Sequence, residues 1–425
     1  MNMRKISYPA VGDELYTTVL ENGLTVCVVP RRGFRRRQAT FAVNYGGAAR
    51  SFTLAGKRID TPAGCAHFLE HKMFDMPDGS AMDIFTQRGA DANAYTSADL
   101  TAYFFECDQD FDANLELLLK FVTTPYFTAE SVERERGIIG QEIRMTEDDP
   151  SFVLYTSTMG ALFDHHPVRE SVAGTVDSIA SITPELLYDC HRAFYVPSNM
   201  VLTVCGDVDP DEIARMAEEF TPDAAGEAAQ PDYGEVESLE PVSARVERTM
   251  DISEPLFTVA AKISTDLPQT GEAVELLTAG ELAVRCLFGP GSDFYTSLYA
   301  EGLLRGNFYR DVSPIAGTMI FECGGASAKP QTVFERMCSA METAARRGFD
   351  AAEFERARRA AYGATLRSLD DADGLCSELA HARFDGCGVY ESFEALEKAT
   401  PDAAVQFVRE YLRPERMVLT TVLPK

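Results

Sequence analysis

An internal repeat with a constant spacing of 217 residues constrains the fold of this 425-residue chain more than any other feature. The pair Thr183-Pro184 recurs as Thr400-Pro401. Twelve residues after each pair comes the pattern Pro-x-x-Met-Val-Leu-Thr, at residues 197–203 and 414–420. Repetition of a long pattern at one spacing indicates a duplicated structural unit. The chain is therefore predicted to consist of two homologous domains.

Each copy is predicted to begin with antiparallel strands, continue through helices and end with a strand. In the first copy Asn22-Gly23 separates two strand-like segments, and this dipeptide is the strongest short hairpin signal. Strands are predicted at residues 15–20, 24–29, 40–45, 93–97, 100–107 and 200–206, and helices at 81–88, 111–124, 129–148 and 183–195. This order predicts an α+β fold in which each domain is a mostly antiparallel sheet with helices packed on one face. The predicted parts are a first domain at 1–222, an acidic linker bearing proline and glycine at 223–243, and a second domain at 244–425.

The stretch 60–74 carries the clearest chemical pattern. It is predicted to be a helix that starts with Thr61 as its cap and Pro62 in the first helical position. His67 and His71 are four residues apart, so their imidazoles lie on one face, and Glu70 leans toward the same side. Two neutral imidazoles on adjacent turns suit a tetrahedral zinc ion, and a neighbouring carboxylate can take a proton from a water. The pattern H-x-x-E-H therefore predicts a catalytic zinc site.

The alternative is that these histidines are ordinary buried residues with satisfied hydrogen bonds. The chain has only six histidines, which makes an accidental H-x-x-E-H uncommon. The pair His165-His166 is a weaker metal candidate, because adjacent residues cannot share a helix face. At the repeat spacing, the three motif residues fall on Val284, Leu287 and Phe288. The second copy is therefore predicted to have lost the metal.

Two histidines leave a catalytic zinc site one protein ligand short of the usual three. Glu142 lies in an apolar stretch of a predicted helix, where an unpaired charge would be unfavourable. Glu135 lies seven residues earlier on the same helix face, at a position suited to a hydrogen bond with a ligand histidine. Taken alone, either glutamate would be interpreted as part of a solvated helix face.

Composition narrows the function further. The formal net charge of −27 argues against nucleic acids and anionic membranes as partners and favours neutral or basic peptides. No stretch approaches 18 apolar residues, and the first residues lack an apolar signal core. The ten cysteines are scattered without paired spacing, so reduced thiols and a cytoplasmic location are expected. The arginine-rich segment 31–37 is predicted to be a solvated connection between strands, the alternative being a contact with an acidic partner.

With these residues considered, the chain resembles the pitrilysin/insulinase-type inverzincin metallopeptidases, in the branch that includes mitochondrial processing peptidase. The resemblance rests on residues 67–74, 89–97, 133–142 and 194–200. It implies a processing-peptidase-like (LuxS-type) metallohydrolase fold and a Zn²⁺-dependent endopeptidase that cleaves extended peptides. It implies specific roles for residues of this chain: His67, His71 and Glu142 as metal ligands, Glu70 as general base, Glu135 beside a ligand, and Asn93, Ala94, Tyr95 and Thr96 as the strand that pairs with substrate.

One departure from the family pattern concerns substrate binding. Active family members resemble one another in a Tyr and an Arg, seven apart in the second domain, that hold the substrate backbone. The corresponding strand at residues 317–323 has no Arg, and Arg383 and Tyr390 fall in a predicted helix and loop. The chain is therefore expected to be the metal-bearing subunit of a two-protein peptidase, with either a related subunit lacking H-x-x-E-H or a second copy. The alternative is a scaffold subunit, or a peptide-binding module in which zinc is structural.

Overall fold

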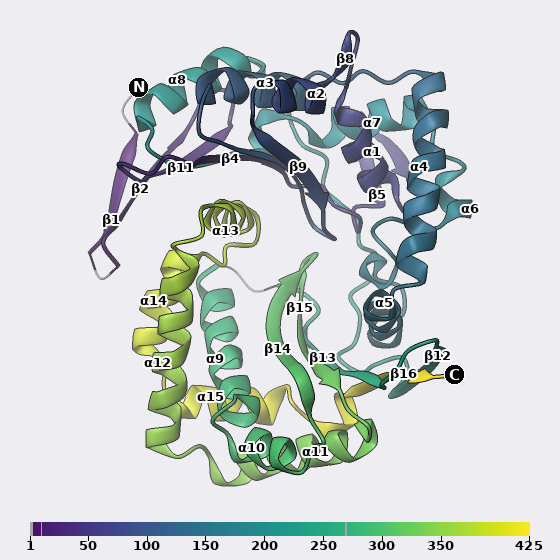
Figure 1. The fold of residues 1–425 in the computed structure, drawn as a ribbon, viewed down its shortest axis with the longest axis vertical. Helices are drawn as coiled ribbons and strands as arrows, with labels where there is room; N and C mark the ends of the chain where they lie inside the picture. Colours follow the sequence, from purple (N-terminus) through teal and green to yellow (C-terminus); the bar gives the residue numbers. More distant parts are fainter. Residues whose placement is uncertain (1–2, 10, 268–269) are drawn as a thin grey trace. The chain divides into compact units, whose positions relative to one another are not determined.

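A computed structural model describes residues 3–9, 11–267 and 270–425. The chain divides into two compact units, each assembled from three stretches of sequence (Figure 1). Unit 1 comprises Met1–Ile143, Ser171–Tyr233 and Leu366–Phe384, and unit 2 comprises Arg144–Glu170, Gly234–Thr365 and Asp385–Lys425. The predicted domain boundaries at residues 222 and 244 follow the sequence repeat and stay a prediction. Each compact unit also contains one segment from the other half of the sequence.

Unit 1 is built on a seven-stranded sheet with the order β1-β2-β3-β11-β4-β10-β9. Only β3 and β11 pair in parallel, and the other neighbours are antiparallel. The predicted hairpin at Asn22-Gly23 is confirmed: Val19 pairs with Thr25, and Gly23 adopts a φ of +87° in the turn. The strands are β1 Arg4–Tyr8, β2 Asp13–Val19, β3 Thr25–Pro30, β4 Arg37–Val43, β9 Asp91–Thr96, β10 Thr101–Cys107 and β11 Met200–Gly206.

One face of this sheet carries the hydrophobic core of unit 1. Alternate residues such as Phe41, Tyr103 and Leu202 pack there against the helices. These are α1 Cys65–Met73, α2 Ala81–Gln87, α3 Phe111–Thr123, α4 Ala129–Glu147, α6 Val176–Ile179, α7 Pro184–Phe194 and α8 Pro210–Phe220. Short hairpins β5 Ser51–Leu54 with β6 Lys57–Asp60, and β7 Asp75–Met76 with β8 Gly79–Ser80, complete the unit.

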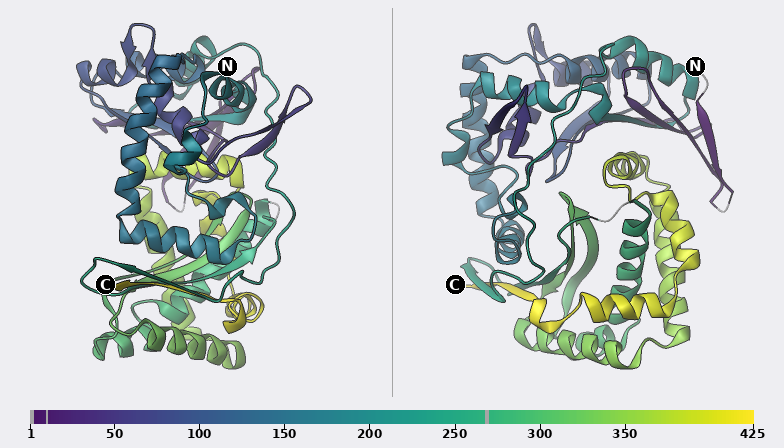
Figure 2. Two further views of the ribbon diagram at one scale, coloured as in Figure 1. Left: turned by 90° about the vertical axis from the view of Figure 1, so that its right-hand side faces the viewer. Right: turned by 180° about the vertical axis from the view of Figure 1, so that it is seen from behind.

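The opposite face of the sheet is covered by α13 Ala372–Asp385, which comes from the second half of the chain (Figures 1 and 2). Tyr95 and Ser377 are joined through their hydroxyls at 2.8 Å, and the Thr203 hydroxyl donates to the carbonyl of Cys376 at 2.9 Å. The sheet of unit 1 is therefore sandwiched between helices of both sequence halves.

Unit 2 contains a five-stranded sheet with the order β12-β16-β13-β15-β14. This is the order β3-β11-β4-β10-β9 of unit 1, and the parallel pair β12/β16 corresponds to β3/β11. The match supports the duplication predicted from the repeat. The strands are β12 Arg245–Met250, β13 Leu256–Ser264, β14 Arg305–Ile315, β15 Thr318–Ala326 and β16 Val418–Pro424.

Helices of both halves also build unit 2. α5 Pro150–Leu162 comes from the first half and packs on β12, β13 and β16. The two halves therefore exchange helices, α5 for α13. The remaining helices are α9 Thr270–Phe288, α10 Asp293–Ala300, α11 Pro330–Arg347, α12 Ala351–Ser368, α14 Val389–Lys398 and α15 Pro401–Glu410.

Most predicted elements are confirmed within a few residues, and the start of the motif helix is the main error. The helix begins at Cys65, and its N-cap is Gly64 rather than Thr61. The Thr61 hydroxyl instead donates to the carbonyl of Arg50, which ties the end of β6 to the rest of unit 1. A Cβ on Gly64 would lie 2.6 Å from the carbonyl oxygen of Ala173, so this tight approach requires glycine.

Three further findings bear on the sequence predictions. Tyr390 lies in α14, and not in a loop as expected. Residues 31–37 do connect β3 to β4, and most of their side chains are exposed. Across the part of the chain that the structure describes, no helix has the length and apolar character needed to cross a membrane.

Candidate metal centre

His67 and His71 lie one turn apart on α1 and face Glu142 on α4. The Nε2 atom of His67 is 3.6 Å from Oε1 of Glu142, and Nε2 of His71 is 3.5 Å from Oε2 of the same carboxylate. The three possible ligand atoms all lie within 4.8 Å of one another. Ligand atoms that bind one tetrahedral zinc at about 2.1 Å lie about 3.4 Å apart. The residues present therefore fit a zinc ion.

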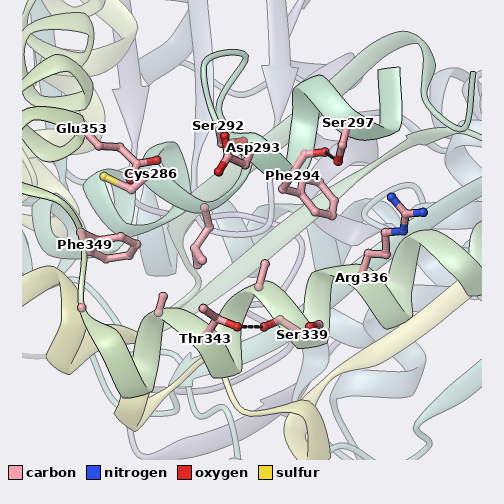
Figure 3. A pocket seen from close by; sticks show the side chains of 14 residues that line it. Cys286, Ser292, Asp293, Phe294, Ser297, Arg336, Ser339, Thr343, Phe349 and Glu353 are labelled. Atoms are coloured by element: carbon pink, nitrogen blue, oxygen red, sulfur yellow. Dashed lines mark hydrogen bonds between the residues drawn. The ribbon is translucent and has the colours of Figure 1, made fainter. Parts of the chain in front are cut away.

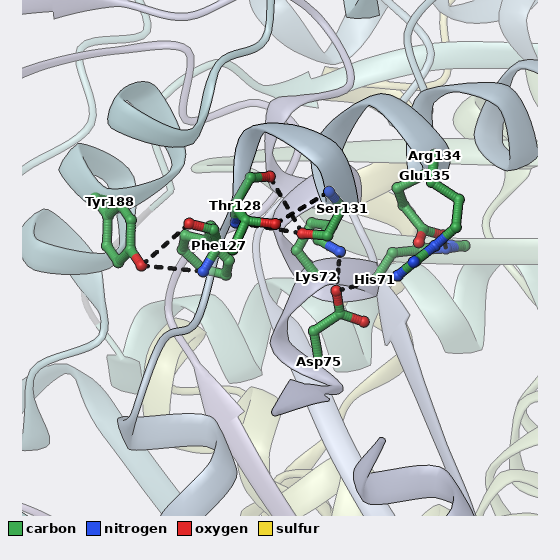
Figure 4. A network of polar contacts seen from close by, with 9 residues as sticks. All are labelled: His71, Lys72, Asp75, Phe127, Thr128, Ser131, Arg134, Glu135 and Tyr188. Carbon is green, nitrogen blue, oxygen red and sulfur yellow. Dashed lines mark hydrogen bonds and ion pairs between the residues drawn. The ribbon is translucent and has the colours of Figure 1, made fainter. Parts of the chain in front are cut away.

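Glu135 lies seven residues before Glu142 on the same face of α4. Its Oε1 atom is 3.0 Å from Nδ1 of His71 (Figure 4). When Nδ1 donates its proton to this carboxylate, Nε2 keeps the lone pair that a metal requires. The equivalent Nδ1 of His67 is buried and has no hydrogen-bond partner among the described residues. The orientation of His67 thus depends on packing, whereas Glu135 fixes that of His71.

A second polar network secures the neighbouring ends of α1 and α4 (Figure 4). Lys72 is fully buried and forms an ion pair with Asp75, which also lies 3.7 Å from a guanidinium nitrogen of Arg134. At the start of α4, Thr128 and Ser131 bond to each other's backbone N–H groups. These contacts fix the two helices that carry the histidines and Glu142.

Glu70 is 6% exposed and lies beside the histidine pair. Its Oε2 atom accepts a hydrogen bond of 2.6 Å from the hydroxyl of Thr96, at the end of β9. Burial raises the pKa of Glu70, and the hydrogen bond from Thr96 opposes this rise. Its second oxygen, Oε1, forms no hydrogen bond with the described residues and is available for proton transfer.

The protonation of the histidines follows from their surroundings. Burial, with a smaller contribution from His71, lowers the pKa of His67 to about 4, so its imidazole is neutral at pH 7. Burial works against charge on His71 as well, but the hydrogen bond to Glu135 and the nearby carboxylates outweigh it and raise its pKa. The hydrogen bond with His71 lowers the pKa of Glu135.

The predicted substrate strand is the edge strand of its sheet. β9 pairs with β10, and no other described strand pairs with it. Its outer edge can therefore accept a further strand within unit 1. Asn93 bonds to the backbone N–H of Ala94, and Tyr95 contacts α13. Thr96 bonds to Glu70, a contact that sequence reasoning missed because it joins a strand to a helix through space.

The other candidate positions do not form metal sites. Val284, Leu287 and Phe288 are buried, and their apolar side chains offer no metal-binding atom. Nδ1 of His166 accepts a hydrogen bond from the backbone N–H of Val168. Among the described residues, His67, His71 and Glu142 are the one group of three or more side chains placed to hold a metal.

Two protein-family models match parts of this chain. The family model described as Insulinase (Peptidase family M16) matches residues 52–176, and that described as Peptidase M16 inactive domain matches residues 181–361. The uncharacterized zinc protease YmfH of Bacillus subtilis is 34% identical over 431 residues, which cover 100% of each chain. A mitochondrial-processing peptidase subunit beta of Schizosaccharomyces pombe is 27% identical over 230 residues, which cover 53% of this chain and 49% of that protein.

Solved structures extend the comparison to the fold. The crystal structure of an M16-like peptidase from Alicyclobacillus acidocaldarius has a TM-score of 0.92 and 34% identity, covering 99% of this chain and 100% of the other. Pitrilysin has a TM-score of 0.79 at 17% identity, over 100% of this chain and 47% of its own, which shows a shared fold alone. The predicted fold class and family resemblance are thereby confirmed, and the chain belongs to the insulinase family of M16 peptidases.

Proposed function

We propose that this chain is a zinc-dependent endopeptidase that hydrolyses extended peptides. The observation that carries the proposal is the triangle of donor atoms of His67, His71 and Glu142, with the buried carboxylate of Glu70 beside it. The name zinc protease of the Bacillus subtilis relative, and of a 36% identical relative in Mycobacterium leprae, supports zinc as the metal.

In this proposal His67, His71 and Glu142 would hold the zinc ion. Zinc at such a site supplies a Lewis acid that polarises a carbonyl and makes water more acidic near neutral pH. Glu70 accepts the proton of the attacking water at Oε1, because Oε2 is held by Thr96. It then delivers that proton to the leaving amine. Glu135 keeps His71 in the tautomer that ligates.

The peptide is proposed to add a strand to the open edge of β9 at Asn93, Ala94, Tyr95 and Thr96. Backbone hydrogen bonds would then bind it with little demand on sequence. Since Thr96 also holds Glu70, the strand that receives the peptide is tied to the proposed base. The charge of −27 supports neutral or basic peptides over acidic ones.

We also propose that the chain acts with a second subunit, either a related chain that lacks H-x-x-E-H or a second copy. The similarity to a processing-peptidase beta subunit supports this arrangement. The strand β15 supports it too, because no arginine stands between Thr318 and Ala326 to hold a substrate backbone. Edge-strand pairing alone would then leave the peptide loosely positioned, and positioning is worth orders of magnitude in rate.

The substitution Glu70→Gln tests the function. It keeps the shape of the side chain and its contact with Thr96 but removes the proton acceptor. We expect the variant to bind about one zinc per chain and to cleave a fluorogenic peptide roughly 100- to 10,000-fold more slowly than wild type. Glu130→Gln, an exposed change on α4, is the matched control and should cleave at the wild-type rate. Near wild-type hydrolysis by Glu70→Gln would overturn the assignment of Glu70 as base.

A further inference from the structure

The duplication defines a counterpart of the metal centre in unit 2. β14 is the edge strand there, as β9 is in unit 1. When residues are matched across each sheet from the repeated strands β11 and β16, Arg310 takes the position of Ala94, and Val312 takes that of Thr96. At the repeat spacing of 217 residues, Val284 on α9 takes the position of His67. The counterpart of the metal centre therefore lies between α9 and β14.

A cavity occupies this counterpart position. Its volume is about 350 Å³. α9 and β14 line it, and the lining residues that matter here are Glu281, Val284, Arg285, Asn307, Tyr309 and Arg310. The positions of the two histidines are thus occupied by apolar residues, and the side chain of Arg310 on the edge strand β14 lines the cavity.

The charge of Arg310 is not neutralised by the protein. Its Nε atom is buried without a hydrogen-bond partner, and the side chain forms no ion pair among the described residues. Two carboxylates line the cavity: Glu281 is bound to Arg285 at 2.8 Å and 2.9 Å, and Asp311 forms no ion pair with Arg310. Burial, together with repulsion from Arg285, lowers the pKa of Arg310. Burying a charge without a partner is unfavourable, so an anion would stabilise this side chain.

Another cavity of unit 2 provides a contrast (Figure 3). It measures about 390 Å³ and lies at α10 and α11, where Cys286, Ser292 and Arg336 contribute to its lining. Both terminal nitrogens of Arg336 bond to the carboxylate of Glu301 at 2.7 Å. That arginine already has a counter-ion within the protein, whereas Arg310 does not.

We propose that the cavity between α9 and β14 binds a small oxyanion-bearing molecule, a carboxylate or a phosphate, through the guanidinium of Arg310. A guanidinium presents paired N–H donors that match the two oxygens of either group. The cavity volume is at the lower end of the range for small-molecule sites, so the ligand is a small one. This site lies within unit 2 and does not depend on zinc in unit 1 or on peptide hydrolysis.

Calorimetric titration of the full chain tests the proposal, with succinate as the carboxylate and inorganic phosphate as the phosphate. Succinamide and sodium chloride at matched ionic strength are the uncharged and ionic controls. We expect saturable binding of one of the two anions at about one per chain, and at least tenfold weaker binding by Arg310→Gln. Arg305→Gln, on the same strand but exposed, should stay within about twofold of wild type. The anion that binds shows whether the natural ligand carries a carboxylate or a phosphate group.

Two results would overturn the proposal. One is the absence of saturable binding of either anion to the wild-type chain, and the other is equal binding by wild type and Arg310→Gln. We expect Arg310→Gln to fold and to melt above the anion-free wild type, because it removes a half-buried charge that forms no ion pair. Should that variant be unstable, Arg310→Lys decides, since lysine keeps the charge but lacks the paired donors. Unchanged affinity in Arg310→Lys would also contradict the proposed contact.

Discussion

At the scale of single residues, Thr96 determines how the Glu70 carboxylate is presented. Its hydroxyl donates to Oε2 at 2.6 Å and lies 3.3 Å from the hydroxyl of Thr101, which donates to the carbonyl of Tyr45 at 2.8 Å. The hydroxyl protons of both threonines are therefore used in hydrogen bonds, and Thr96 bonds to the Glu70 carboxylate through Oε2 only. Oε1 is the oxygen left for chemistry.

Replacing Thr96 with Val tests this arrangement, because valine keeps the branched shape and removes the hydroxyl. A hydrogen bond to a charged group is worth about 1.5–3 kcal/mol, which corresponds to a roughly 10- to 100-fold fall in kcat. KM and zinc content should change little, and Thr96→Ser should restore most of the rate. Steady-state kinetics with zinc analysis of the three proteins provides the measurement. A fall in Thr96→Val that Thr96→Ser shares equally would indicate a packing defect instead.

Residue spacing alone predicts only part of the candidate site. His67, Glu70 and His71 lie within one helix, so the period of the helix predicts that they lie close together. Glu142 and Glu135 lie on a different helix; helix context and their seven-residue spacing made them candidates, and the family resemblance implied their roles. The hydrogen bond from Thr96 to Glu70 depends on how β9 packs against α1. No local pattern encodes that contact.

At the scale of elements, a glutamate in the predicted linker secures unit 2. Glu237 accepts hydrogen bonds from the backbone N–H groups of Asp164, His165 and His166, and its Oε2 atom is 3.1 Å from the ammonium of Lys262. The side chains of Glu237 and Lys262 are only 3% and 2% exposed. This cluster joins the loop after α5 to strand β13.

We expect Glu237→Gln to destabilise unit 2 by about 3–5 kcal/mol at pH 7, because it leaves Lys262 buried without a counter-ion. Burial alone would raise the pKa of Glu237, but the backbone donors and Lys262 outweigh it and lower the pKa from 4.5 to about 2. A carboxyl group whose pKa is lower in the folded than in the unfolded protein stabilises the fold at pH values above its unfolded pKa. This stabilisation is lost as the pH falls through the folded-state pKa. The stability difference from wild type should therefore narrow between about pH 4.5 and pH 2.

Urea unfolding of wild type and Glu237→Gln across this pH range measures the effect. Glu235→Gln, an exposed neighbour in the same segment, is the control and should match wild type throughout. A difference that is independent of pH would mean that the charge of Glu237 is not what stabilises the cluster.

The elements themselves were largely predictable where local signals are strong. The hairpin around Asn22-Gly23 and the start of α7 at Thr183 follow from turn and capping chemistry, and Thr183 does accept a hydrogen bond from the backbone of Leu186. The exchange of α5 and α13 between the halves was not predictable, because it depends on which sheet face each helix covers. The burial of Glu237 was not predictable either, because the composition of its segment indicates a solvated linker.

At the scale of the whole molecule, the two copies have diverged in opposite directions. One carries three side chains placed to hold a metal ion, and in the other all three motif positions are occupied by buried apolar side chains. We therefore expect the chain alone to be a slow peptidase, and a related subunit lacking H-x-x-E-H to increase its rate by at least tenfold.

Titration of a candidate partner into a fixed amount of this chain, with cleavage of a fluorogenic peptide as the readout, measures that dependence. The same titration with the Glu70→Gln variant is the control, and it should stay slow at every partner concentration. A wild-type rate that is already high and does not respond to the partner would count against the two-protein arrangement.

Zinc content of the purified chain tests the central claim most directly. Elemental analysis of the wild type should give about one zinc per chain, and His165→Ala, a histidine outside the centre, should give the same. His67→Ala and His71→Ala should each lose nearly all of the metal, and Glu142→Gln should bind it more weakly. Full zinc occupancy in both histidine variants would contradict the account, because the metal would then be held elsewhere.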